Sequence, residues 1–173
     1  MIFILTGPVH SGKTTFLKRV VHKLKEQKVN VDGFLSEVVF INKEAIGYDL
    51  FDLREKRSVP FIRREGQKNW QRIGPYFFIP QGFAHARKII FRGKDADLLV
   101  VDEVGHLELA QKGLWSALEK VLFRPLTKLL LVVRKTVLED FLKVLKGKEV
   151  RIFDIKEKEI FSQIIKEIKS QNN

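Results

Sequence analysis

Residues 7–15 read GPVHSGKTT and directly follow the apolar run MIFILT at residues 1–6. The segment matches the pattern Gly, four residues, Gly, Lys, Ser/Thr, in which a glycine-rich loop presents backbone N–H groups to a phosphate. A continuous apolar run of this kind predicts a strand that is buried on both faces of a parallel sheet. Because such a loop lies between a buried strand and a helix, this order predicts an α/β fold with a mostly parallel sheet and helices on both faces.

The residues after the loop indicate the required helix. Its apolar side chains recur at helical spacing, with Lys and Arg between them: Phe16, Leu17, Val20, Val21 and Leu24. The helix is predicted to begin at Lys13, where free N–H groups and the positive end of the helix dipole favour a phosphate. We therefore expect a nucleotide-binding loop of nine residues: Gly7, Pro8, Val9, His10, Ser11, Gly12, Lys13, Thr14 and Thr15.

Three side chains of the loop have expected roles. Lys13 should reach the β and γ phosphates and also support catalysis, the Thr14 hydroxyl should occupy one Mg²⁺ position, and Thr15 should approach the α-phosphate. His10 is interpreted as a tolerant loop position, because the loop needs only its backbone there. An ordinary glycine turn is the alternative interpretation, and it leaves unexplained why Lys13 and Thr14 open a helix.

Two further buried strands end in charged residues. The run DLLVVDE at 97–103 predicts one strand, and open α/β sheets place their ligands at the carboxyl ends of such strands. Asp102 is expected to hold Mg²⁺ through water, and Glu103 to orient and activate the water that attacks the γ-phosphorus. The run KLLLVVR at 128–134 ends at Arg134, a candidate sensor of γ-phosphate charge. The alternatives are a solvated acidic pair and an ordinary surface arginine.

The rest of the chain continues the alternation. Helices are predicted near 111–123 and 137–146, a last strand at 149–154, and a striped C-terminal helix from Ile160 onward. Residues 33–79 differ, because they read as short strands joined by polar turns, which predicts an antiparallel insertion between the first and second parallel strands. The sequence contains no internal repeat and no low-complexity linker. We therefore predict a single domain over residues 1–173.

Four segments, GPVHSGKTT, GFLSEVVF, IGYDLFDL and VVDEVGHLEL, give the chain a resemblance to a known family. In this order and spacing they resemble the small nucleoside-triphosphatase family first described in thermophiles, whose vertebrate members are called cancer-related nucleoside triphosphatase. The resemblance extends to about residue 145. It implies a RecA-like P-loop core and Mg²⁺-dependent hydrolysis of ATP, GTP, CTP and UTP to diphosphates with low base selectivity. Lys13, Thr14, Asp102 and Glu103 match the family pattern position by position.

Composition limits the partners and the location. Lys and Arg outnumber Asp and Glu by 32 to 21, and the resulting +11 favours anionic partners such as nucleotides or nucleic acid without choosing among them. No run approaches the roughly 18 apolar residues of a membrane span, so we expect a cytoplasmic protein with no membrane contact. The chain contains no Cys, which removes thiolate metal sites and disulfides, and its Lys/Glu-rich composition resembles that of a thermophile.

Three alternatives to a nucleoside-triphosphatase with low base selectivity fit parts of the sequence. The run DEVG at 102–105 also fits regulatory GTPases, but the guanine-reading Asn-Lys-x-Asp element is missing. A kinase could pass the γ-phosphate to a small molecule or a nucleoside monophosphate. A nucleic-acid-binding ATPase could use the basic and aromatic segment 54–78, although a solvated loop is the favoured interpretation of that charge run. The sequence predicts no oligomeric state.

Overall fold

The computed structural model describes residues 1–123 and 128–170. Within these residues nine strands form one sheet in the order β5-β6-β4-β3-β2-β7-β8-β1-β9. The strands are β1 (Ile2–Thr6), β2 (Val31–Ile41), β3 (Glu44–Asp52), β4 (Arg57–Arg63), β5 (Arg72–Ile73), β6 (Tyr76–Phe78), β7 (Leu98–Val104), β8 (Lys128–Val133) and β9 (Val150–Asp154). The helices are α1 (Lys13–Glu26), α2 (Pro80–Arg92), α3 (His106–Leu109), α4 (Trp115–Leu122), α5 (Leu138–Val144) and α6 (Ile160–Ser170).

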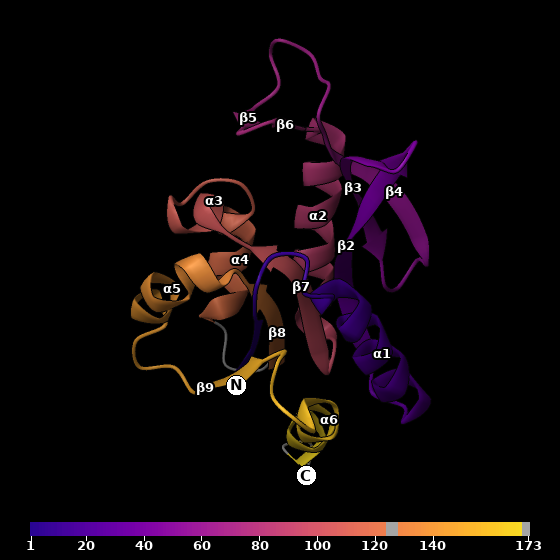
Figure 1. Cartoon of the computed structure of the whole chain (residues 1–173). Helices are drawn as coiled ribbons and strands as arrows, with labels where there is room; N and C mark the ends of the chain where they lie inside the picture. The colour runs from indigo at the N-terminus through magenta and orange to yellow at the C-terminus, as the bar shows by residue number, and fades with distance from the viewer. Residues whose placement is uncertain (124–127, 171–173) are drawn as a thin grey trace.

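The sheet has a parallel part and an antiparallel part (Figure 1). Strands β2, β7, β8, β1 and β9 pair with one another in parallel, whereas β2, β3, β4, β6 and β5 pair antiparallel. Helices cover both faces of the parallel part, as the alternation of strands and helices requires. The predicted α/β class with an antiparallel extension is confirmed.

The two faces of the sheet bury separate apolar clusters. In β1, Ile2 and Ile4 face the cluster formed with α2, α4 and α5, while Phe3 and Leu5 face the cluster formed with α1 and α6. Because successive side chains of a strand point to opposite faces, a strand with helices on both sides must be apolar at every position. This is the physical reason for the continuous apolar run that opens the sequence.

The register of the parallel strands places the charged ends together. β1 lies between β8 and β9, with β7 on the far side of β8. Asp102 in β7 is paired with Val132 in β8, and Arg134 follows the end of β8 directly. The loop after β1, the acidic end of β7 and Arg134 therefore lie along the same carboxyl edge of the sheet.

The antiparallel part begins inside a parallel strand. The first residues of β2, Val31 to Phe34, pair in parallel with β7, and β2 then continues alone as the antiparallel partner of β3. The prediction placed the insertion at residues 33–79, between the first and second parallel strands, so it assigned β2 from Gly33 onward to the insertion. One strand of 11 residues belongs to both parts because it is long enough to extend beyond the end of β7.

The helices differ from the sequence-based predictions in three places. Helix α2 was not predicted, and the predicted helix near 111–123 is preceded by the separate short helix α3. The predicted helix near 137–146 is preceded by a separate 3₁₀ turn, Lys135–Val137, and α5 begins at Leu138. Among the described residues, none of the helices combines the length and apolar character that crossing a membrane requires.

Candidate active site

The loop between β1 and α1 forms one side of a cavity at the carboxyl edge of the sheet. Gly12 precedes α1 with φ +82°, a left-handed conformation that glycine adopts without a steric penalty. The cavity encloses about 1150 Å³, part of it open to solvent. Its lining includes the loop residues Val9 to Thr15, together with Lys18, Ser36, Glu37, Val38, Tyr48, Asp102, Glu103 and Arg134.

The Lys13 ammonium group contacts the carbonyl groups of its own loop. Its Nζ donates to the Pro8 oxygen at 2.5 Å and to the Gly7 oxygen at 3.2 Å. The Ser11 hydroxyl also donates to the Pro8 oxygen, at 2.7 Å. Gly7 and Pro8 thus act through their backbone, and they are absent from the cavity lining among the described residues. Charged phosphate oxygens are stronger acceptors for an ammonium group than these carbonyls.

Asp102 is a buried carboxylate that joins three elements. Its Oδ2 accepts the Thr14 hydroxyl of α1 at 2.9 Å and the Ser36 amide of β2 at 3.2 Å. Burial raises the pKa of Asp102 to about 7, against the opposing effect of these hydrogen bonds. A hard cation here would have a hydroxyl and a carboxylate oxygen as ligands, which is the donor set that Mg²⁺ prefers. The residues present therefore fit a magnesium ion.

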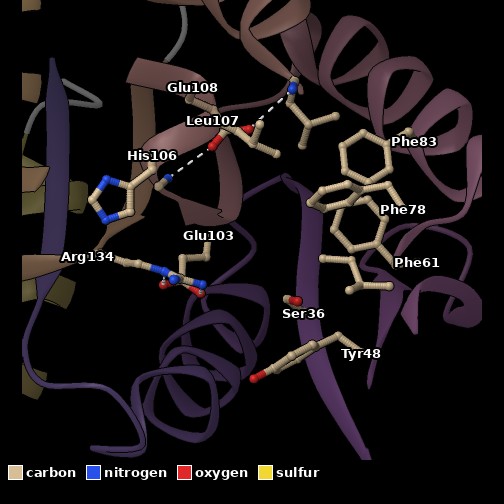
Figure 2. A pocket seen from close by; sticks show the side chains of 13 residues that line it. Ser36, Tyr48, Phe61, Phe78, Phe83, Glu103, His106, Leu107, Glu108 and Arg134 are labelled. Atoms are coloured by element: carbon tan, nitrogen blue, oxygen red, sulfur yellow. Dashed lines mark hydrogen bonds and ion pairs between the residues drawn. The ribbon is translucent and has the colours of Figure 1, made fainter. Parts of the chain in front are cut away.

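Glu103 and Arg134 form an ion pair beside Asp102. The Arg134 Nε donates to Glu103 Oε1 at 2.5 Å, and a second guanidinium nitrogen lies 3.4 Å from Oε2 (Figure 2). Burial works against the charge of Arg134, but the neighbouring Glu103 outweighs it and raises the pKa of the guanidinium further. Both side chains line the same cavity as the loop. The structure thus brings the predicted loop, carboxylates and arginine to one place.

Two residues of the antiparallel part were missed by sequence reasoning. Ser36 on β2 contributes the amide that binds Asp102, and Tyr48 on β3 lines the cavity near Glu103 and Arg134. Burial, with Tyr76 and Glu103 nearby, raises the pKa of the Tyr48 hydroxyl. Ser36 lies in the segment GFLSEVVF and Tyr48 in IGYDLFDL. Both segments were part of the family resemblance, which could have pointed to these residues, but no role was predicted for them.

Part of the basic and aromatic segment 54–78 is engaged within the molecule, and much of the rest is exposed. Arg54 pairs with Asp32 at 2.8 Å and Arg57 with Glu55 at 2.5 Å, while Arg63 pairs with Asp49. The aromatic rings of Phe61 and Phe78 are buried in the core. These two rings therefore do not form an open surface on which successive bases of a nucleic acid could stack. Nucleic-acid binding stays a prediction.

Comparisons with known proteins show which family the sequence matches. The sequence matches the model of a family described as NTPase over residues 2–168. The nucleoside-triphosphatase THEP1 of Hyperthermus butylicus is 33% identical over 120 residues, covering 69% of this chain and 64% of that protein. The cancer-related nucleoside-triphosphatase homolog of Bos taurus is 32% identical over 136 residues, covering 73% of this chain and 71% of that protein.

Two solved structures share the fold. The human cancer-related nucleoside triphosphatase superimposes with a TM-score of 0.78 at 25% identity, over 99% of this chain and 98% of that one. THEP1 from Aquifex aeolicus gives a TM-score of 0.78 at 20% identity, over 98% of this chain and 99% of that one. The antiparallel part is included in these superpositions, since they cover nearly the whole chain.

Proposed function

The chain belongs to the NTPase family, and on that premise we propose that it hydrolyses nucleoside triphosphates to diphosphates and phosphate with Mg²⁺ and low base selectivity. Relatives that cover most of its length are named nucleoside-triphosphatases. The observation that carries the proposal is the placement of Asp102. Its carboxylate accepts the Thr14 hydroxyl at 2.9 Å, next to Lys13 on one side and Glu103 on the other.

Each residue then has one task. The loop amides from His10 to Thr15 and the Lys13 ammonium bind the phosphates. Thr14 and Asp102 would hold Mg²⁺, which neutralises charge on the β and γ phosphates when it is bound. Glu103 accepts a proton from the water that attacks the γ-phosphorus, and Arg134 stabilises the charge that develops on the transferred group.

A paired experiment tests this proposal. Glu103→Gln keeps the size and hydrogen bonding of the side chain but cannot accept the proton, so hydrolysis should fall by about 10² to 10⁴. Nucleotide affinity should stay close to that of the wild type, because the loop and Asp102 are unchanged. Lys13→Ala should instead weaken binding itself, since it removes a positive charge from the β and γ phosphates.

The measurements are equilibrium binding of a fluorescent triphosphate and single-turnover release of phosphate, on the wild type and both variants. If Glu103→Gln released phosphate at nearly the wild-type rate, Glu103 would be ruled out as the general base. That result would instead favour the regulatory-GTPase alternative for the run 102–105, in which the Gly105 amide, here donated to Glu108 at 3.0 Å, would turn to the γ-phosphate.

A further inference from the structure

A second cavity adjoins the nucleotide cavity and shares one wall with it. The shared wall consists of Ser36, Tyr48, Glu103 and Arg134, which line both cavities. The second cavity encloses about 680 Å³, part of it open to solvent, and its apolar lining is Phe61, Ile62, Phe78, Phe83, Leu107 and Leu114. We call this second cavity the aromatic pocket (Figure 2).

The rings of the aromatic pocket are fixed by their packing. Phe61 and Phe83 stack with ring centroids 4.5 Å apart, and Phe78 meets Phe83 edge to face at 4.6 Å. These rings come from β4, β6 and α2, and all three are buried. Figure 2 shows the three rings gathered on one side of the space, with Glu103 and Arg134 on the other.

On the opposite wall of the aromatic pocket, the buried carboxylate of Glu108 binds two backbone amides. Glu108 accepts the Gly105 amide at 3.0 Å and the Leu114 amide at 3.2 Å, so it ties the segment after Glu103 to the start of α4. Leu107 and Leu114, on either side of this clamp, line the pocket. The space is therefore bounded by ordered elements on both sides and has an apolar interior with a polar mouth.

Hydrolysis alone does not account for an apolar pocket beside Glu103, the proposed general base. Attack on a phosphate by water requires room for one water molecule, and water in a cavity needs about two to four polar partners. The walls formed by Phe61, Phe83 and Leu107 offer none through their side chains. A flat apolar group fits these walls, because aromatic rings pack against one another in stacked or edge-to-face geometry.

On the basis of the proposed function, we propose that the aromatic pocket binds a small alcohol with a flat apolar body, and that this alcohol accepts the γ-phosphoryl group. The hydroxyl of the alcohol lies beside Glu103, in the place of the attacking water. Its oxygen forms a bond to the γ-phosphorus as the bond from that phosphorus to the β–γ bridging oxygen breaks. Glu103 takes the hydroxyl proton, and the products are a nucleoside diphosphate and a phosphate monoester.

Binding is tested with a matched pair of probes, 2-phenylethanol and ethylbenzene, which share the ring and differ in the hydroxyl. We expect both probes to shift the methyl NMR signals of Ile62, Leu107 and Leu114 saturably. The methyl signals of Ile164 and Ile168, buried on the other face of the sheet, should stay unchanged. If neither probe moves the pocket signals up to its solubility limit, the aromatic pocket is not an apolar binding site.

Transfer is tested by comparing diphosphate formed with phosphate released from ATP. With 2-phenylethanol the diphosphate should exceed the free phosphate, and the difference should appear as a new phosphate monoester by ³¹P NMR. Ethylbenzene, which cannot accept the group, should slow release by excluding water from Glu103. Equal amounts of diphosphate and phosphate with bound 2-phenylethanol would overturn the acceptor role. Hydrolysis without either probe tests the proposed function separately.

Two substitutions in α3 test whether the probes bind in the aromatic pocket. Leu107→Phe adds volume inside the aromatic pocket and should weaken the binding of both probes by about tenfold or more. Leu109→Phe is the matched control, because Leu109 packs against the core and is not part of the pocket lining. Equal probe binding in Leu107→Phe and in the control would show that the probes bind elsewhere and would overturn the proposal.

Discussion

At the scale of single residues, the proposed roles of Glu103 and Arg134 meet in one ion pair. The Arg134 Nε donates to Glu103 Oε1 at 2.5 Å, so the guanidinium occupies the carboxylate that is proposed to take the proton of water. The guanidinium charge can stabilise the transferring phosphoryl group, an effect worth about 10³ to 10⁵ in rate where an arginine finger provides it. General base catalysis contributes about 10² to 10⁴, so losing the arginine should cost more than freeing the Glu103 carboxylate from the ion pair gains.

We therefore expect Arg134→Ala to lower the rate of phosphate release. Arg134→Lys should retain part of the rate, because it keeps the charge but loses the planar guanidinium group. Single-turnover phosphate release on both variants, with nucleotide affinity measured in parallel, checks this expectation. A faster Arg134→Ala enzyme would mean that the ion pair with Glu103 restrains the base and that another group carries the charge stabilisation.

The residues predicted from sequence at this scale are those that act within short local patterns. Lys13 and Thr14 are fixed by the loop and the first turn of α1, and Asp102 and Glu103 by the end of a single strand. Tyr48 could not be placed in the same way, because its position depends on the register of β3 in the antiparallel part. That pairing contains an irregularity between Tyr48 and Asp49, which no local sequence pattern specifies.

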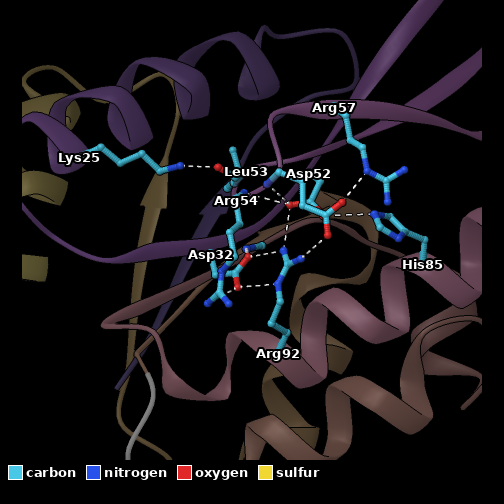
Figure 3. A network of polar contacts seen from close by, with 10 residues as sticks. Lys25, Asp32, Asp52, Leu53, Arg54, Arg57, His85 and Arg92 are labelled. Atoms are coloured by element: carbon cyan, nitrogen blue, oxygen red, sulfur yellow. Dashed lines mark hydrogen bonds and ion pairs between the residues drawn. The ribbon is translucent and has the colours of Figure 1, made fainter.

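At the scale of elements, Arg92 joins the parallel and antiparallel parts of the sheet. From the end of α2 its guanidinium donates to Asp32 of β2 at 2.7 and 2.9 Å and to Asp52 of β3 at 2.8 Å (Figure 3). Both aspartates are fully buried. Arg54 and His85 contact the same carboxylates, at 2.8 and 3.1 Å. Two buried carboxylates without a compensating charge would destabilise the fold.

Arg92→Met should therefore lower the free energy of unfolding by about 3 to 5 kcal/mol, toward the lower end because Arg54 and His85 remain. Lys88→Met is the control, since Lys88 is exposed on the same helix and loses the same charge. Urea unfolding at pH 7 measures both. Equal small losses in the two variants would mean that the Arg92 contacts contribute no more than a surface charge.

The contribution of the Arg92–Asp52 pair to the free energy of unfolding is expected to fall at low pH. Burial works against the charged form of Asp52, but the hydrogen bonds from Arg92 and from the Glu55 and Arg54 amides outweigh it and lower the pKa of this carboxyl group. The stabilisation is complete above the unfolded pKa of about 3.9 and is lost as the pH falls through the lower folded value. The difference in unfolding free energy between wild type and Arg92→Met should therefore be smaller at pH 3 than at pH 7. An unchanged difference would contradict this linkage.

Helix α2 itself shows why one element escaped prediction. Its sequence begins with Pro80 and has Gly82 in the first turn, and both residues are usual signals of a turn. Pro80 occupies the first turn, where its missing N–H is tolerated. A Cβ at Gly82 would lie 2.4 Å from the Pro60 carbonyl oxygen, so this glycine allows close packing of the helix on β4. That reason is tertiary and is not visible in the local sequence.

At the scale of the whole molecule, the binding groups that can be recognised are suited to phosphate and metal rather than to a nucleobase. Lys13, Thr14 and Asp102 all lie at the carboxyl edge of the parallel strands, and the sequence contains no guanine-reading element. A dedicated polar contact to a base would supply discrimination well above about a hundredfold. We expect kcat/KM for ATP, GTP, CTP and UTP to differ by less than that. A larger preference for one nucleotide would reveal a polar contact to its base from another part of the chain.

The position of β1 in the sheet also bears on how the protein is made. Its neighbours are β8 and β9, and Ile2 pairs with Leu129, 127 positions later in the chain. The hairpins from β2 to β4 pair locally and can form while synthesis continues. The first strand, apolar throughout, has no partner in the sheet until most of the chain has left the ribosome. The nascent chain therefore exposes this apolar strand until β8 and β9 have been synthesised, and nucleotide can help to complete the fold only after that point.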